Sequence, residues 1–223
     1  MLKLVTQNLS IVAAMGLLLF LPAGTLAWPQ AWIFLLLFLG CGHATGYWLL
    51  MTNPEFLGER MKSPLRGNQT PRDRTLTVVF CVALCVWLVI MALDACRFGW
   101  SSTPVWTEVF GAGLVAATFY GWSRVLRANS FAVTSVRLQP QRGQMVISTG
   151  PYSVVRHPMY AVASGILVGI PLLLGSLWGL LGIFVFMPLL ALRALGEEDI
   201  LIGGLKGYRR YAASVRYRLF PSI

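Results

Sequence analysis

Residues 159–194 read MYAVASGILVGIPLLLGSLWGLLGIFVFMPLLALRA, and this stretch decides the fold. It contains two apolar runs, 159–174 and 177–194, which are separated only by Gly175 and Ser176. Apolar runs of about 17 to 20 residues can cross the hydrocarbon core of a bilayer as helices. Because two residues leave room only for a tight reversal, the stretch predicts a helical hairpin. The chain would then leave the membrane on the side from which it entered.

The rest of the chain has the same apolar character. Only 12% of its 223 residues are charged and 57% are hydrophobic, whereas a soluble domain carries about twice that share of charge. The sequence therefore predicts an all-α fold, a polytopic membrane helix bundle of about six transmembrane helices with a C-terminal helical hairpin. The first run is expected to be a membrane helix and no signal peptide, because PAGTLA lacks a small-x-small cleavage site. The four upstream runs lie at about 9–27, 32–51, 75–93 and 105–123.

The distribution of basic residues sets the expected topology. The chain has 18 Lys and Arg residues and a formal net charge of +10. If the N-terminus is cytoplasmic, every one of them except Arg97 falls in a cytoplasmic segment. This bias follows the positive-inside rule and predicts an integral membrane protein with both termini in the cytoplasm. The positive charge is thus explained by topology, and no nucleic-acid partner is expected.

We divide the chain into two parts of one continuous domain. Residues 1–126 hold the N-terminal transmembrane helices, and 127–223 hold a cofactor-binding loop, the hairpin and a C-terminal tail. The 32 residues of 127–158 contain no span, and a loop of that length is usually functional or disordered. No metal site is expected, because two distant histidines and four cysteines without a Cys-x-x-Cys motif supply too few ligands.

Two polar clusters flank the predicted hairpin. Pro158 fits the first turn of a helix and would hold His157 at the cap position. The helix start and the side chain of Arg156 would then suit an anion. The acidic cluster suits a cation or a diol. S-adenosylmethionine carries a carboxylate, an ammonium group, a ribose diol and a second positive charge. The sequence therefore predicts it as the cofactor. The clusters are Tyr152, Arg156, His157, Pro158 and Tyr160 before the hairpin, and Arg193, Glu197, Glu198 and Asp199 after it.

Each of these residues also has a structural alternative. Arg156 could be an interfacial anchor, and His157 could be a satisfied helix cap. The acidic residues could pair with the basic residues of the tail. An ionisable residue inside a span, His43, is a functional candidate, although a neutral hydrogen-bonded histidine explains it better.

The segment from 127 to 221 resembles the integral-membrane isoprenylcysteine carboxyl methyltransferase family, which is related to the phospholipid N-methyltransferases. The resemblance is carried by GPYSVVRHPMY, PLLLGS, EED and GYRRYAASVRYRLFP, and NPEFLGERMK looks like bacterial members. It implies a cytoplasmic cofactor pocket and a location in the bacterial inner membrane. Gln144, which stands where some relatives carry histidine, joins the residues with implied cofactor roles. These are Gln144, Gly150, Tyr152, Arg156, His157, Pro158, Tyr160, Glu197 and Glu198.

The sequence thus predicts methyl transfer from S-adenosylmethionine to a lipophilic acceptor from the bilayer, such as an isoprenylcysteine carboxylate or another lipid. We expect Arg193 to hold the acceptor and Glu197, one turn later on the same face, to lie closer to the cofactor than Glu198. Two alternatives remain: a sterol-reductase-like, NADPH-dependent membrane reductase, and a membrane transporter or scaffold without enzymatic activity.

Overall fold

The computed structural model describes residues 1–63 and 70–221, and every regular element among them is helical. Five helical segments are long and apolar enough to cross a membrane, and a sixth apolar helix is shorter. The predicted all-α membrane bundle is therefore confirmed. The six long elements are α1 (Leu2–Ala23), α2 (Pro29–Thr52), α4 (Pro71–Ala92), α5 (Val105–Ala128), α6 (Pro158–Leu174) and α7 (Gly182–Gly204).

Short helices complete the fold. They are α3 (Pro54–Arg60), α8 (Tyr208–Ser214), the π-helix η1 (Leu93–Phe98), and the 3-10 helices η2 (Pro140–Arg142), η3 (Gly150–Ser153) and η4 (Trp178–Leu181). Helix α1 begins seven residues before the predicted span, and α7 continues ten residues beyond it. Helix α3 lies within the charged segment 52–74 between α2 and α4, and residues 64–69 of that segment are outside the described part of the chain.

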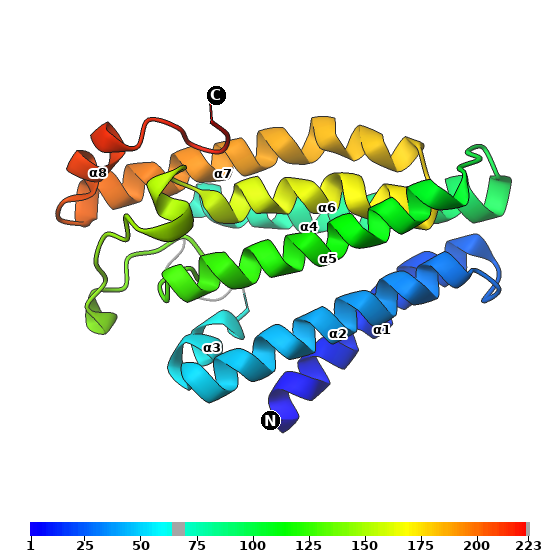
Figure 1. Ribbon diagram of the computed structural model, residues 1–223, viewed down its shortest axis with the longest axis horizontal. Coiled ribbons are helices and arrows are strands. Elements are labelled where there is room, and N and C mark those ends of the chain that lie inside the picture. The colour runs from blue at the N-terminus through cyan, green and yellow to red at the C-terminus, as the bar shows by residue number, and fades with distance from the viewer. Residues whose placement is uncertain (64–69, 222–223) are drawn as a thin grey trace.

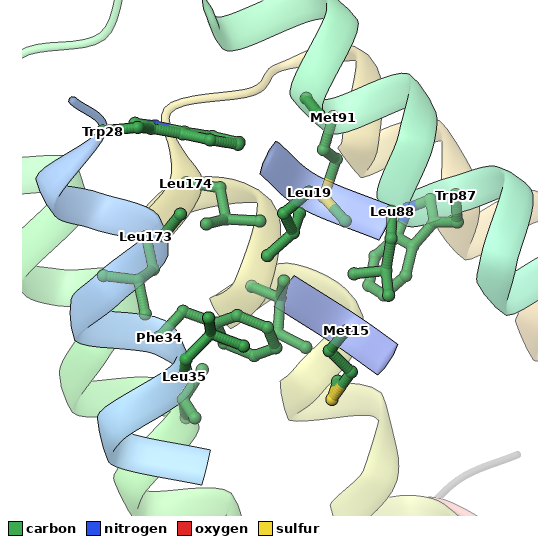
Figure 2. Packing of buried hydrophobic residues seen from close by; sticks show 14 of the residues in the cluster. Met15, Leu19, Trp28, Phe34, Leu35, Trp87, Leu88, Met91, Leu173 and Leu174 are labelled. Carbon is green, nitrogen blue, oxygen red and sulfur yellow. The ribbon is translucent and has the colours of Figure 1, made fainter. Parts of the chain in front are cut away.

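The core lies where α1, α2, α4 and α6 meet. Figure 2 shows Leu19 from α1 and Phe34 from α2 close to Leu88 and Met91 from α4. Each of these side chains is almost fully buried. Inside a bilayer such packing is stabilised by van der Waals contacts between the helices, because lipid tails are as apolar as these side chains.

Helices α5 and α6 approach each other very closely, because glycines line their contact. A Cβ at Gly111 would lie 2.4 Å from the backbone nitrogen of Leu173, and one at Gly165 would lie 2.4 Å from Thr118 Oγ1. The motif GAGLVA at 111–116 is therefore a packing surface within α5. Small residues at such contacts let two helices approach closely.

The predicted hairpin is present, and a buried carboxylate holds its turn. Asp94 in η1 has no exposed surface. Its Oδ2 accepts hydrogen bonds from Ser176 Oγ (2.6 Å), Ser101 Oγ (2.7 Å) and the backbone N–H of Trp178 (3.3 Å). These bonds tie the turn between α6 and α7 to the end of α4.

The opposite end of the bundle carries most of the irregular chain. Figure 1 shows α3, the loop between α5 and α6, α8 and the C-terminal segment gathered at the left end of the molecule. This is the end that the charge bias assigns to the cytoplasm. The hairpin thus brings the start of α6 beside the end of α7, as the sequence predicts.

Candidate active site

A cavity of about 90 Å³, open on one side, lies at this end of the bundle. Its walls come from the start of α6, the end of α7, α8 and the loop between α5 and α6. Six of the ten predicted site residues line it: Gln144, Tyr152, Arg156, His157, Tyr160 and Glu197.

His157 occupies the N-cap of α6, as expected from the proline that follows it. Its backbone is non-helical (φ −123°, ψ 64°), and Pro158 takes the first helical position. The imidazole makes no cap hydrogen bond. Instead it is buried, with Nε2 3.1 Å from Glu198 Oε1 and Nδ1 3.6 Å from Glu197 Oε2. The ring is therefore fixed between the two glutamates of α7.

The two glutamates have different surroundings because adjacent helical residues point about 100° apart. Glu198 is only 3% exposed, and it pairs with Arg156 Nε and Arg218 Nε, each at 3.1 Å, in addition to His157. Glu197 keeps a third of its side chain exposed, lines the cavity and accepts a hydrogen bond from Tyr160 Oη at 3.0 Å. The expected order, with Glu197 towards the ligand space, agrees with this geometry; the cofactor roles stay predictions.

The charges of the two predicted clusters largely neutralise each other. Burial lowers the pKa of His157, but its hydrogen bonds to Glu197 and Glu198 outweigh burial and raise this pKa to about 9. The imidazole is therefore a cation at neutral pH. Arg156 and His157 each have a carboxylate partner and also line the cavity, and their roles towards an anion stay predictions.

The C-terminal segment closes one side of the site, and this position was not predictable from the sequence. The backbone N–H groups of Arg156 and His157 donate to the carbonyls of Tyr217 and Arg218, both at 2.9 Å. Tyr211 Oη donates to the carbonyl of Tyr152 at 2.8 Å. Only the repeated Tyr and Arg residues of the tail gave a signal, and no local pattern indicates where a tail folds back.

Tyr208 offers a test of whether the cavity suits S-adenosylmethionine. Its side chain is buried and lines the cavity, and its hydroxyl has no hydrogen-bond partner among the residues that the structure describes. A buried hydroxyl without a partner costs about 1–3 kcal/mol, so it is suited to a polar ligand. With Glu197 for a diol or an ammonium, and tyrosine rings for a cation, the donor set fits the cofactor.

The remaining predicted residues lie outside the cavity lining. Pro158 is buried at the helix start, and Gly150 begins η3 with a positive φ of 60°. Glu198 lies behind His157, as described above. Arg193 lines a smaller neighbouring cavity, where it pairs with Asp73 (3.6 Å) and donates to the carbonyl of Thr134 (2.5 Å). Asp73 was not recognised from the sequence, because an acid at a helix start is usually a capping residue.

Comparison with known proteins covers a large part of this site, but not α8 or the C-terminal segment. Residues 106–203 match the family described as phospholipid methyltransferase. This range includes most of α5, the loop that follows it, α6 and nearly all of α7. A search of curated proteins finds no match. Through residues 106–203 the chain is similar to the phospholipid methyltransferase family, which agrees with the resemblance to membrane methyltransferases expected from the sequence.

Proposed function

We propose that the protein is an S-adenosylmethionine-dependent methyltransferase that acts on a lipophilic acceptor from the bilayer. The observation that carries the proposal is a cavity at one end of a membrane bundle, lined by Glu197 and His157 of the segment that matches the methyltransferase family and by Tyr208, which follows that segment. The three side chains come from α7, α8 and the cap of α6, so the hairpin and tail together create the site.

Distinct groups of the cofactor would contact distinct residues. Glu197 would accept hydrogen bonds from the ribose hydroxyls or the ammonium group. The hydroxyl of Tyr208 and the amide of Gln144 would bind polar atoms, and the rings of Tyr152 and Tyr211 would lie near the positive charge. The ion pairs of Glu198 with Arg156 and Arg218 would keep the cap of α6 and the tail in place.

The reaction would need alignment more than acid-base catalysis. When bound, S-adenosylmethionine supplies an activated methyl group, which the acceptor oxygen takes while the carbon–sulfur bond breaks and its electron pair stays on sulfur. We propose a carboxylate as the acceptor, because it has no proton to lose. This suits a site whose histidine is already protonated between two carboxylates. The protein then contributes orientation and a fixed electrostatic environment.

Isothermal titration of the purified protein with S-adenosylhomocysteine and with NADPH tests the cofactor class. We expect saturable binding of S-adenosylhomocysteine and none of NADPH. Binding of NADPH alone would favour a membrane reductase and contradict the proposal. Absence of binding by both would favour a transporter or scaffold.

The acceptor atom can be tested separately. The protein is incubated in membranes of its expression host with S-adenosylmethionine that carries a radioactive methyl group, and the lipids are extracted. A methyl ester releases methanol in mild base, whereas an N-methyl or S-methyl product is stable. Base-stable label would contradict the carboxylate acceptor and leave methyl transfer itself intact.

We also propose that both termini face the cytoplasm of a bacterial inner membrane. In a variant without Cys41, Cys81, Cys85 and Cys96, single cysteines are placed at two exposed positions, Ser102→Cys between η1 and α5 and Lys206→Cys between α7 and α8. An impermeant maleimide should label Ser102→Cys in intact cells and should label Lys206→Cys only after lysis. The reverse pattern would contradict the orientation.

A further inference from the structure

The segment 132–136, called the cavity wall below, has no regular secondary structure although it lines the main cavity. Ala132, Val133, Ser135 and Val136 all contribute to the lining. Backbone N–H and C=O groups in a buried irregular segment must find partners outside a helix or sheet. The cavity wall therefore depends on other parts of the molecule for its position.

Side chains from three helices bind backbone groups at every second residue of the cavity wall. Arg60 of α3 donates from Nη1 to the carbonyl of Ala132 at 2.5 Å. Arg193 of α7 donates from Nη2 to the carbonyl of Thr134 at 2.5 Å. The N–H of Val136 donates to Asp73 Oδ2 of α4 at 3.4 Å. Helices distant in sequence are thus connected through one short segment.

Two of these anchors form an ion pair with each other. Arg193 Nε lies 3.6 Å from Asp73 Oδ1, and the side chains are only 16% and 6% exposed. The pair lines a small cavity that shares only Val136 and Ile200 with the main one. The guanidinium of Arg193 is therefore behind the wall, with Asp73 and Thr134 as its partners, and not in the main cavity.

We propose that Asp73 and Arg193 are positioning residues, which act through the cavity wall to align the methyl acceptor with the cofactor. The inference rests on the proposed function and replaces the role of Arg193 as a direct acceptor clamp. A buried pair with defined geometry can fix a wall more firmly than an exposed one, and a displacement of about 1 Å near a reacting centre can cost about a hundredfold in rate.

The pair allows a test by compensation. Asp73→Asn keeps an oxygen for the N–H of Val136, and Arg193→Gln keeps an amide donor for the carbonyl of Thr134. Each single variant leaves one buried charge without its partner, which is strongly unfavourable, whereas the double variant leaves none. The double variant should therefore resemble the wild type more than either single variant does.

Hydrogen–deuterium exchange of the full-length protein measures the wall directly. Each single variant should raise exchange at 132–136 by about tenfold, as expected for a lost hydrogen bond, and the double variant should restore most of the protection. S-adenosylhomocysteine affinity, measured on the same preparations, should stay close to that of the wild type. Arg74→Gln is the matched control, since Arg74 is exposed next to Asp73 on α4, and it should change nothing.

Methyl transfer to membrane lipids, measured on the same four proteins, separates positioning from contact. The single variants should lose up to about a hundredfold in rate. The double variant should regain most of its rate together with the protection of 132–136. The double variant could regain the protection of 132–136 and still transfer methyl groups as slowly as Arg193→Gln. This result would show that the guanidinium contacts the acceptor, and it would overturn the inference. Equal exchange in all four proteins would also overturn it. A wild type without any methyl transfer would instead contradict the proposed function, and the exchange data would still decide whether the pair positions the wall.

Discussion

The two ends of the α6–α7 hairpin each bury a carboxylate, but they surround it differently. At the turn, Asp94 accepts hydrogen bonds from two serine hydroxyls and one backbone N–H. At the other end, Glu198 pairs with two arginines and a protonated histidine. The first set is made of neutral donors, and the second is made of cations.

The two carboxylates also differ in what they hold together. The groups around Asp94 close a turn, and Asp94 itself is completely buried. The groups around Glu198 hold three separate segments, the cap of α6, the end of α7 and the tail, beside a cavity. A charged network requires desolvation of each ion, and proteins tend to retain such networks where a specific geometry is needed.

The strongest expected effect comes from removal of Glu198. Glu198→Ala would leave Arg156 and His157 buried without their partner, which should cost about 3–5 kcal/mol of stability. The measurement is thermal denaturation of the detergent-solubilised protein, followed by the loss of the monodisperse peak. Asp199→Ala, an adjacent but exposed acid, is the control and should melt as the wild type does. Equal melting temperatures of the two variants would show that the network does not stabilise the fold.

The charged end should respond to pH through His157. Its folded-state pKa of about 9 lies above the ordinary value of 6.5. The stabilisation is therefore fully present below about pH 6.5 and is lost as the pH rises through about 9, with a size on the order of 3 kcal/mol. Melting temperatures at pH 6.5 and 9.5 measure this loss. His157→Gln should flatten the dependence, and His43→Gln should retain it. A steep dependence that survives in His157→Gln would assign it to another group.

The neutral end should show a smaller effect, and one confined to stability. Asp94→Ala leaves three donors without an acceptor, so a loss of about 1–3 kcal/mol is expected. Asp94→Asn keeps an acceptor oxygen and should lose less. Affinity for S-adenosylhomocysteine should be unchanged in both. Loss of S-adenosylhomocysteine affinity at a normal melting temperature in either variant would contradict this prediction, because it would show that the turn is coupled to the cavity.

The smallest expected effect concerns Glu197, which faces the cavity. Glu197→Gln should weaken S-adenosylhomocysteine binding by about tenfold, the size of one hydrogen bond to a charged group, with little change in melting temperature. Glu198→Gln should instead lower the melting temperature more than the affinity. Titration and melting of both variants measure the contrast. The opposite order would mean that Glu198 is the ligand contact.

The elements that the sequence predicts best are those with a local signal. Long apolar runs predicted the spans, and Gly175-Ser176 predicted the hairpin. The ends of the helices were predicted less accurately than the helices themselves. Helix α7 continues beyond Ala194 because Glu197 and Glu198 find partners within the protein, so polarity did not end the helix.

The site was predictable where it depended on a short motif. His157 and Pro158 form the expected start of α6, and Glu197 lies on the expected side. The contributions of Tyr208, Arg218 and Asp73 were not predictable, because each depends on contacts between segments far apart in the chain. No periodicity or spacing encodes such a contact in a single sequence.

The shortness of α6 has a consequence for how a lipid reaches this protein. With 17 residues, α6 is about 26 Å long, whereas the hydrocarbon core of a bilayer is about 30 Å thick. An untilted α6 whose turn lies at one hydrocarbon boundary would end about 4 Å short of the other, and a bilayer adapts to such a mismatch by local thinning. Withdrawal of a lipid costs about 0.8 kcal/mol for each CH₂ that enters water. Local thinning of the bilayer beside the cavity would lower this cost, because the polar atoms of the lipid would then already lie at the depth of the cavity.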